Sequence, residues 1–127
     1  MENNLAITTQ RLVDEIDTHL KNVPEFHLLE GADAYDIELV RKRYNIVLAY
    51  NSNLNDLIIK SEHFQSIMKV TIKKLSDNIV AERNTKIQIK EAVSIVEEIS
   101  KPLYTEKDKI DRLLRYFERA FNIYIRP

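Results

Sequence analysis

Glycine and proline are nearly missing from this chain, and their scarcity limits its fold more than any other feature. Only one of the 127 residues is glycine and three are proline. From Ala32 to Lys101 the chain runs for 70 residues without either. β-Sheet folds and phosphate-binding loops need the tight turns that these residues supply, so both are excluded. The sequence therefore predicts an all-α fold, with four or five antiparallel helices in a single domain over residues 1–127.

Apolar residues at helical spacing locate the first helix. It is expected over residues 4–22, and Val23-Pro24 should end it because proline cannot continue a helix. Residues 25–32 are interpreted as a connection, which contains the single glycine. Asp33 is the expected N-cap of the next helix, since a short carboxylate can accept hydrogen bonds from the first free backbone amides.

The second half of the chain carries further helix boundaries. Thr85 and Gln88 form a capping-box pattern that predicts a helix start, and Pro102 predicts an end near Ser100. Thr105 is the expected start of a last helix. That helix should turn a mostly aromatic and aliphatic set inward: Ile110, Leu113, Leu114, Phe117, Phe121 and Tyr124.

A heptad pattern lies within the long stretch that has no glycine or proline. Its positions alternate spacings of three and four: Ile37, Val40, Tyr44, Val47, Asn51, Leu54 and Ile58. Such a pattern is typical of a helix that pairs with another helix, and an asparagine at one core position commonly sets register or partner number. We therefore expect these residues, called the heptad seam below, to mediate self-association. The alternative is that the polar run from Asn51 to Asp56 is a loop, because asparagine and serine favour turns.

The length of this stretch leaves two arrangements open. An unbroken helix reaching Arg83 would be about 75 Å long, whereas a compact globule of this size is only about 35–40 Å across. Either the chain bends near residues 51–56 or 61–63, or the molecule is an elongated rod that pairs with a second chain.

Few residues offer catalytic or metal-binding chemistry. The chain has no cysteine, which excludes thiolate metal sites and cysteine nucleophiles. His19, His27 and His63 are too far apart in sequence for a metal motif on one helix, and one glycine cannot build a P-loop or nucleophile elbow. We expect no catalytic residues, no metal site and no cofactor.

Charge is distributed unevenly although the net charge is only −1. Residues 1–40 carry nine acidic and two basic side chains, whereas residues 101–127 carry four acidic and seven basic ones. Arg112, Arg115 and Arg119, called the arginine stripe below, share one helix face and are candidates for binding nucleic-acid phosphates. The alternative is a solvated face neutralised by Asp108 and Asp111, and the overall pI of 6.3 is not that of a dedicated nucleic-acid binder.

Together these patterns predict a non-enzymatic helical interaction module, such as an adaptor, an assembly factor or a small inhibitor of a larger machine. Its partner would be another protein, and it would also form homo-oligomers. Nucleic-acid binding through the arginine stripe is the weaker alternative. The longest apolar runs have five residues, too few to span a bilayer, and the acidic, polar N-terminus is unlike a signal peptide. We therefore expect a cytoplasmic protein without membrane contact.

Overall fold

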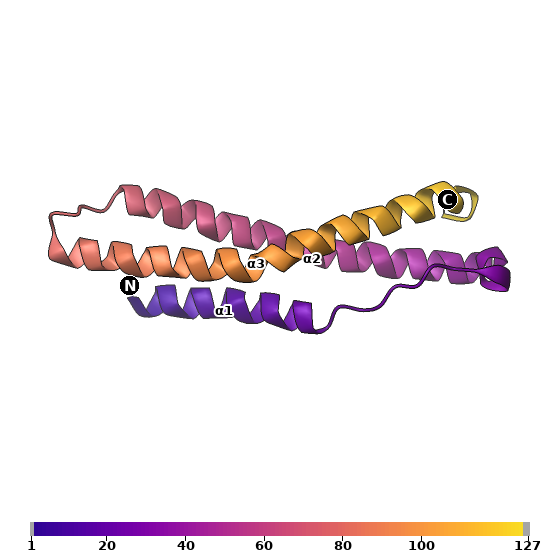
Figure 1. Cartoon of the computed structure of the whole chain (residues 1–127), viewed down its shortest axis with the longest axis horizontal. Helices are drawn as coiled ribbons and strands as arrows, with labels where there is room; N and C mark the ends of the chain where they lie inside the picture. The colour runs from indigo at the N-terminus through magenta and orange to yellow at the C-terminus, as the bar shows by residue number, and fades with distance from the viewer. Residues whose placement is uncertain (1, 126–127) are drawn as a thin grey trace.

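The computed structural model describes residues 2–125 and, in that range, contains only helices and connections (Figure 1). Two long helices dominate it: α2 spans Ile37–Lys73 and α3 spans Val80–Ala120. They form an antiparallel hairpin, and α1 (Glu2–Lys21) lies along one half of it. At 1.5 Å per residue the two long helices measure about 55 and 60 Å, so the molecule is elongated. The predicted all-α bundle is confirmed.

The connection between α1 and α2 is an extended segment, residues 22–30, followed by the short 3₁₀ helix η1 (Gly31–Tyr35). Figure 1 shows this segment, called the strap below, running along the half of the hairpin that α1 does not cover. Gly31 has a φ of 59°, a left-handed conformation that glycine adopts without the penalty of a Cβ atom. The only glycine of the chain thus marks the start of η1.

The N-cap of α2 is Asp36, and the predicted cap at Asp33 is wrong. The side chain of Asp36 accepts a hydrogen bond from the backbone amide of Leu39 at 3.2 Å, whereas Asp33 lies inside η1. Aspartate is a preferred N-cap residue, so residue type alone allows either position. Which of the two caps α2 depends on where the strap meets the hairpin. Local sequence does not determine that position.

Helix α2 runs without interruption through the polar residues from Asn51 to Asp56. Leu54 and Leu57 are buried within this segment, and their burial offsets the weak helix propensity of the asparagines. Neither proposed bend, at 51–56 or at 61–63, is present. The chain instead reverses between Lys74 and Ile79, where the two long helices are joined.

Three helix boundaries predicted from the sequence are wrong, because they lie inside α3. It begins at Val80, so Thr85 lies inside it, and the Thr85 hydroxyl donates to the carbonyl of Ala81 at 3.0 Å. It also continues through Pro102 and Thr105. Proline costs about 3 kcal/mol in a helix interior, but buried residues on both sides of Pro102 hold the helix against the bundle. Figure 1 shows α3 changing direction about halfway along its length.

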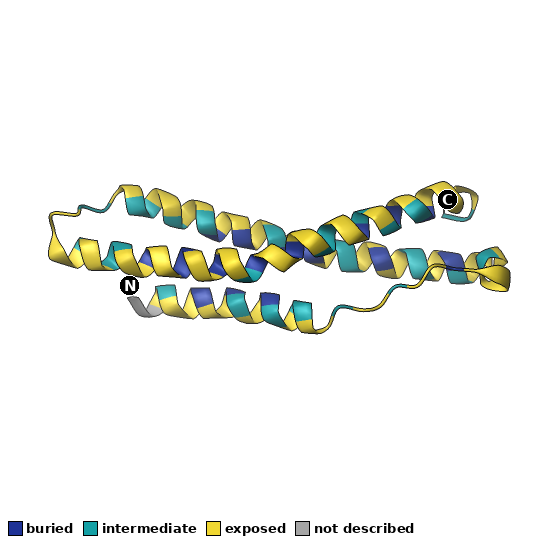
Figure 2. Ribbon diagram, in the orientation of Figure 1, coloured by how far each residue is buried: buried dark blue, intermediate teal, exposed yellow. Residues whose placement is uncertain are grey.

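The core follows the facing sides of the hairpin, and α1 and the strap extend it (Figure 2). Its most enclosed apolar side chains come from all three main helices: Ile16, Val40, Val47, Leu54, Val96, Leu103, Ile110 and Phe117. The inward set predicted for the last helix is buried or half-buried. Its residues lie in the C-terminal part of α3, at the C-cap Phe121 and in α4 (Asn122–Ile125).

Candidate interaction surfaces

The heptad seam lies mostly inside the chain. Val40, Val47 and Leu54 are at most 1% exposed and belong to the common core. Tyr44 and Ile58 are half-buried, while Ile37 is exposed. A second copy can reach the buried members only if α2 separates from α3, so the face predicted for self-association is used within one chain here. Self-association itself stays a prediction.

Asn51, the polar member of the seam, contacts a partner on α3. Its Oδ1 accepts a hydrogen bond from Lys107 Nζ at 2.8 Å, and the same ammonium group contacts Asp111 Oδ1, also at 2.8 Å. Asn51 is half-buried, so the contact satisfies its side chain inside the hairpin. The asparagine therefore aligns two helices of one chain, a role that an isolated heptad pattern cannot distinguish from the alignment of two chains.

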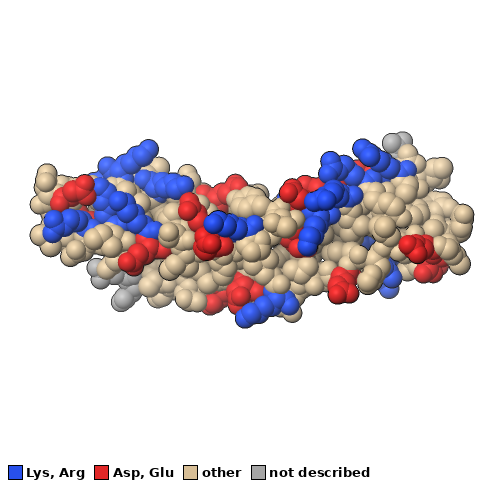
Figure 3. All heavy atoms as spheres, in the orientation of Figure 1, with Lys and Arg blue, Asp and Glu red and all other residues tan. Residues whose placement is uncertain are grey.

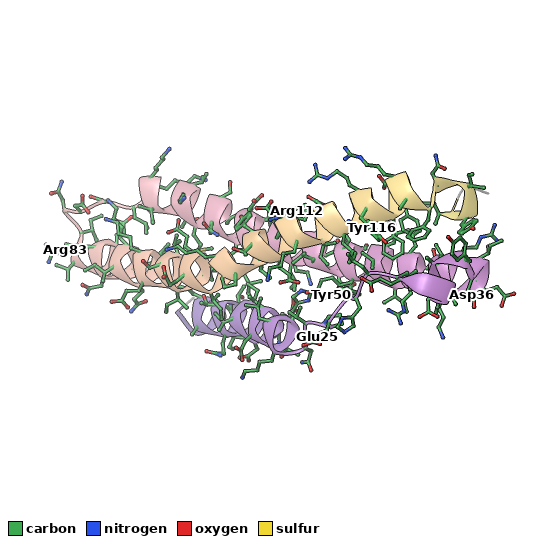
Figure 4. All side chains as sticks on the ribbon, turned by 45° about the vertical axis from the view of Figure 1, so that its right-hand side comes forward. Glu25, Asp36, Tyr50, Arg83, Arg112 and Tyr116 are labelled. Atoms are coloured by element: carbon green, nitrogen blue, oxygen red, sulfur yellow. The ribbon has the colours of Figure 1, made fainter. Side chains whose placement is uncertain are left out.

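The arginine stripe is exposed on the C-terminal half of α3. Arg112, Arg115 and Arg119 line one hollow of about 580 Å³ together with Tyr116 and Ala120. Figure 3 shows basic side chains gathered over this part of the molecule. The prediction that these residues share a face is consistent with the helix geometry, and Figure 4 shows Arg112 and Tyr116 on the same half of α3.

The acidic residues expected to neutralise the stripe are directed elsewhere. Asp111 pairs with Lys107, and Arg112 Nε donates to the backbone carbonyl of Asp108 at 3.3 Å rather than to its carboxylate. Within residues 2–125, no ion pair engages the guanidinium groups of the stripe. Their charge is therefore available to an anionic partner.

A second hollow adjoins the stripe. Arg112 and Tyr116 line both hollows, and the second is completed mainly by the strap and α3. Its apolar lining residues are Val23, Pro24, Phe26, Leu28, Ile110 and Leu113. Its charged lining residues are Glu25, Glu106, Lys109 and Arg112. The strap is held there by buried Leu29, whose carbonyl lies 3.5 Å from the Tyr116 hydroxyl.

A groove between α1 and α2 was not predicted from the sequence. Two adjoining hollows of about 340 and 380 Å³ form it, and they share Thr8, Phe64 and Met68. The groove exists because α1 packs mainly against α3 and only lightly against α2. Apolar residues at helical spacing, Leu57, Phe64 and Met68, indicate core positions, but no local signal shows that α1 leaves part of this face uncovered.

The histidines do not form a common site. His19 stacks on Tyr50 with ring centroids 5.0 Å apart, His27 lies 3.7 Å from Glu25, and His63 lines the α1–α2 groove. Burial lowers the pKa of His19, and the nearby Glu106 carboxylate partly offsets that effect. Burial also raises the pKa of Tyr50 to about 12, again with Glu106 contributing.

In the part of the chain that is described, no group of three or more metal-ligating side chains comes together. Over the same residues, no helix has the length and apolar character needed to cross a bilayer. The fold and its surfaces define an all-α helical bundle with exposed grooves and charged faces. Comparison with models of known protein families, with curated proteins and with solved structures found no match.

Proposed function

We propose that this protein is a non-enzymatic helical interaction module that receives an amphipathic helix of a partner protein in the α1–α2 groove. Adaptors, assembly factors and small inhibitors of larger machines act in this way. The observation that carries the proposal is the apolar floor of the groove, formed by Phe64 and Met68 at the junction of its two hollows.

The groove has dimensions that suit a helix. Its α2 wall extends from Lys60 to Thr71, which corresponds to about 17 Å, or three helical turns. Methionine adapts its flexible side chain to different apolar surfaces, and helix-in-groove binding uses apolar residues at spacings of three and four. A helix placed here would add a fourth helix beside α1, α2 and the first half of α3.

Paired substitutions on α2 test the proposal. Ile67 lines the groove and is 45% exposed, whereas Val70 is 50% exposed and does not line it. Both positions accept glutamate without emptying the core. In affinity capture from an extract of the source organism, Ile67→Glu should lose a partner that the wild-type protein and Val70→Glu retain. Equal recovery of the same partners by all three proteins would contradict the groove proposal.

Nucleic-acid binding is the second candidate, and the free guanidinium groups of the arginine stripe favour it. Phosphates would contact Arg112, Arg115 and Arg119, and an unpaired base would stack on Tyr116. Replacing the three arginines with glutamine should abolish salt-dependent retention on single-stranded DNA or RNA. It should reduce the slope of log affinity against log salt by about two units. Absence of any salt-dependent binding by the wild-type protein would rule this candidate out.

Self-association and a cytoplasmic location remain parts of the proposal that derive from the sequence. The buried residues of the heptad seam are already covered by their own chain. Self-association would therefore use exposed surfaces instead.

A further inference from the structure

We propose that two copies of this chain associate through the arginine stripe of one copy and an acidic segment of the other, namely Glu30–Glu38. This segment, called the acidic tip below, includes η1 and lies at one end of the molecule. The inference rests on the self-association included in the proposed function and names the surfaces that would carry it.

The acidic tip is a short, exposed, negatively charged segment, and one of its carboxylates, that of Asp36, also caps α2 by accepting a hydrogen bond from the amide of Leu39. It carries the carboxylates of Glu30, Asp33, Asp36 and Glu38 and has no basic residue. All four residues are exposed. Over residues 2–125, no ion pair involves these carboxylates, so their charge is available to a second molecule.

The stripe matches the tip in length as well as in sign. Arg112 to Arg119 covers about 10 Å along α3, which suits a short acidic segment. The overall pI of 6.3 also argues against an extended nucleic acid as the ligand of the stripe.

Apolar contacts complement the charges. Tyr35 is 79% exposed and lies between Asp33 and Asp36 in the sequence. On the other surface, Arg112 borders the apolar hollow lined by the strap and Leu113. In the dimer, Tyr35 would reach the apolar hollow beside Arg112 and Lys109, and burial of its ring would add to a charge contact that is weak by itself at an exposed site.

The position of the two surfaces permits a closed dimer. Figure 4 shows Arg112, Tyr116 and Asp36 on the half of the molecule away from Arg83. In the proposed dimer a twofold axis relates the copies, so that the tip of each copy contacts the stripe of the other. Two small contacts then form together, and association ends at two chains instead of continuing into a filament.

The experiment measures the mass of the full chain by sedimentation equilibrium at about 100 µM protein, a concentration at which weak association is visible. The wild-type protein should dimerise at about 50 mM salt, and its dimer affinity should fall at least about tenfold at about 500 mM salt, where exposed charges are screened. A stripe variant (Arg115→Glu with Arg119→Glu) and a tip variant (Glu30→Lys with Asp33→Lys) should each be monomeric. A control at the other end, Lys73→Gln with Lys74→Gln, should dimerise like the wild type.

Mixing the two charge-reversed variants provides the decisive measurement. Each contact then joins a lysine tip to a glutamate stripe or an acidic tip to an arginine stripe, so the mixture should regain the dimer mass. All substituted residues are exposed, and circular dichroism verifies that helical content is kept. A wild-type monomer at low salt would overturn the proposal. So would a dimer that survives both variants, or a mixture that stays monomeric.

The charge-dependent dimer and the α1–α2 groove can fail independently of each other. Loss of the charge-dependent dimer leaves the Ile67→Glu capture result unaffected, because the groove lies on the other half of the hairpin. Salt-dependent retention of the wild-type protein on single-stranded DNA, lost in the stripe variant and without any dimer, would replace the acidic tip with nucleic acid as the ligand of the stripe.

Discussion

The hydroxyl groups of Ser61 and Ser100 lie 2.6 Å apart in the middle of the hairpin and join α2 to α3 across 39 positions of sequence. Both residues are buried, at 0% and 1% exposure. A third group takes part, since Gln65 Nε2 donates to the Ser61 oxygen at 3.1 Å. The two long helices thus share a polar contact inside an otherwise apolar interface.

Substituting these serines should reveal an asymmetry. Ser61→Ala leaves the buried Ser100 hydroxyl and the Gln65 amide without their partner and should lower the free energy of unfolding by about 1–3 kcal/mol. Ser100→Ala should cost less, because Ser61 keeps its contact with Gln65. The double variant should cost less than the sum of the two. Urea unfolding measures all three, and strictly additive losses would show that the hydroxyls do not interact.

The contact between Lys107 and Asn51 predicts a second coupled pair. Asn51→Leu removes one of the two acceptors of the partly buried Lys107 ammonium group, which keeps its contact with Asp111, and should destabilise the protein by about 0.5–1.5 kcal/mol. The heptad pattern alone predicts instead that Asn51→Leu holds or raises stability, since a polar residue at a core position costs stability. Combining Asn51→Leu with Lys107→Met should recover most of the loss, because both polar partners are then replaced by apolar groups. A stable single variant in chemical denaturation would contradict this role of Lys107.

Replacing Pro102 should raise the stability of the protein, unlike the substitutions above. The residue is exposed inside α3, and its ring cannot donate to the carbonyl one turn earlier. Pro102→Ala restores that donor and a better helix propensity, so thermal unfolding should show a gain of up to about 3 kcal/mol. Lys101→Ala serves as the control at the neighbouring exposed position. If Pro102→Ala lowers stability, the change of direction in α3 is needed for packing.

His19 predicts a dependence of stability on pH. Folding lowers its pKa below 6.5, mainly through burial, so the unfolded chain binds the proton more tightly. Stability is therefore unaffected by this group above pH 6.5 and falls as the pH drops below that value, until the folded histidine is also protonated.

His19→Phe keeps an aromatic ring against Tyr50 and removes the titration. The variant should show a shallower loss of stability between about pH 6.5 and 5 than the wild type. Exposed His63→Gln is the matched control and should follow the wild-type curve. Identical pH profiles for wild type and His19→Phe, measured by urea unfolding, would refute the assignment.

The class of fold follows from the sequence because it depends on local chemistry. With one glycine and three prolines the chain cannot make many turns, and helical spacing of apolar residues identifies the buried sides of α1, α2 and the end of α3. The same spacing places Arg112, Arg115 and Arg119 on one face. Periodicity is a property of neighbours within a few turns, so these features need no knowledge of distant contacts.

Helix boundaries and the partner of each apolar face depend on the tertiary structure. Pro102 and Thr85 carry local signals for an end and a start, yet burial along α3 outweighs both. The heptad seam has the same pattern whether it pairs with another chain or with α3, because a core position specifies only that something must cover it. The reversal at Lys74–Ile79 brings α3 onto the seam, and only that long-range packing decides that Val40, Val47 and Leu54 are covered by their own chain and that the α1–α2 groove stays open.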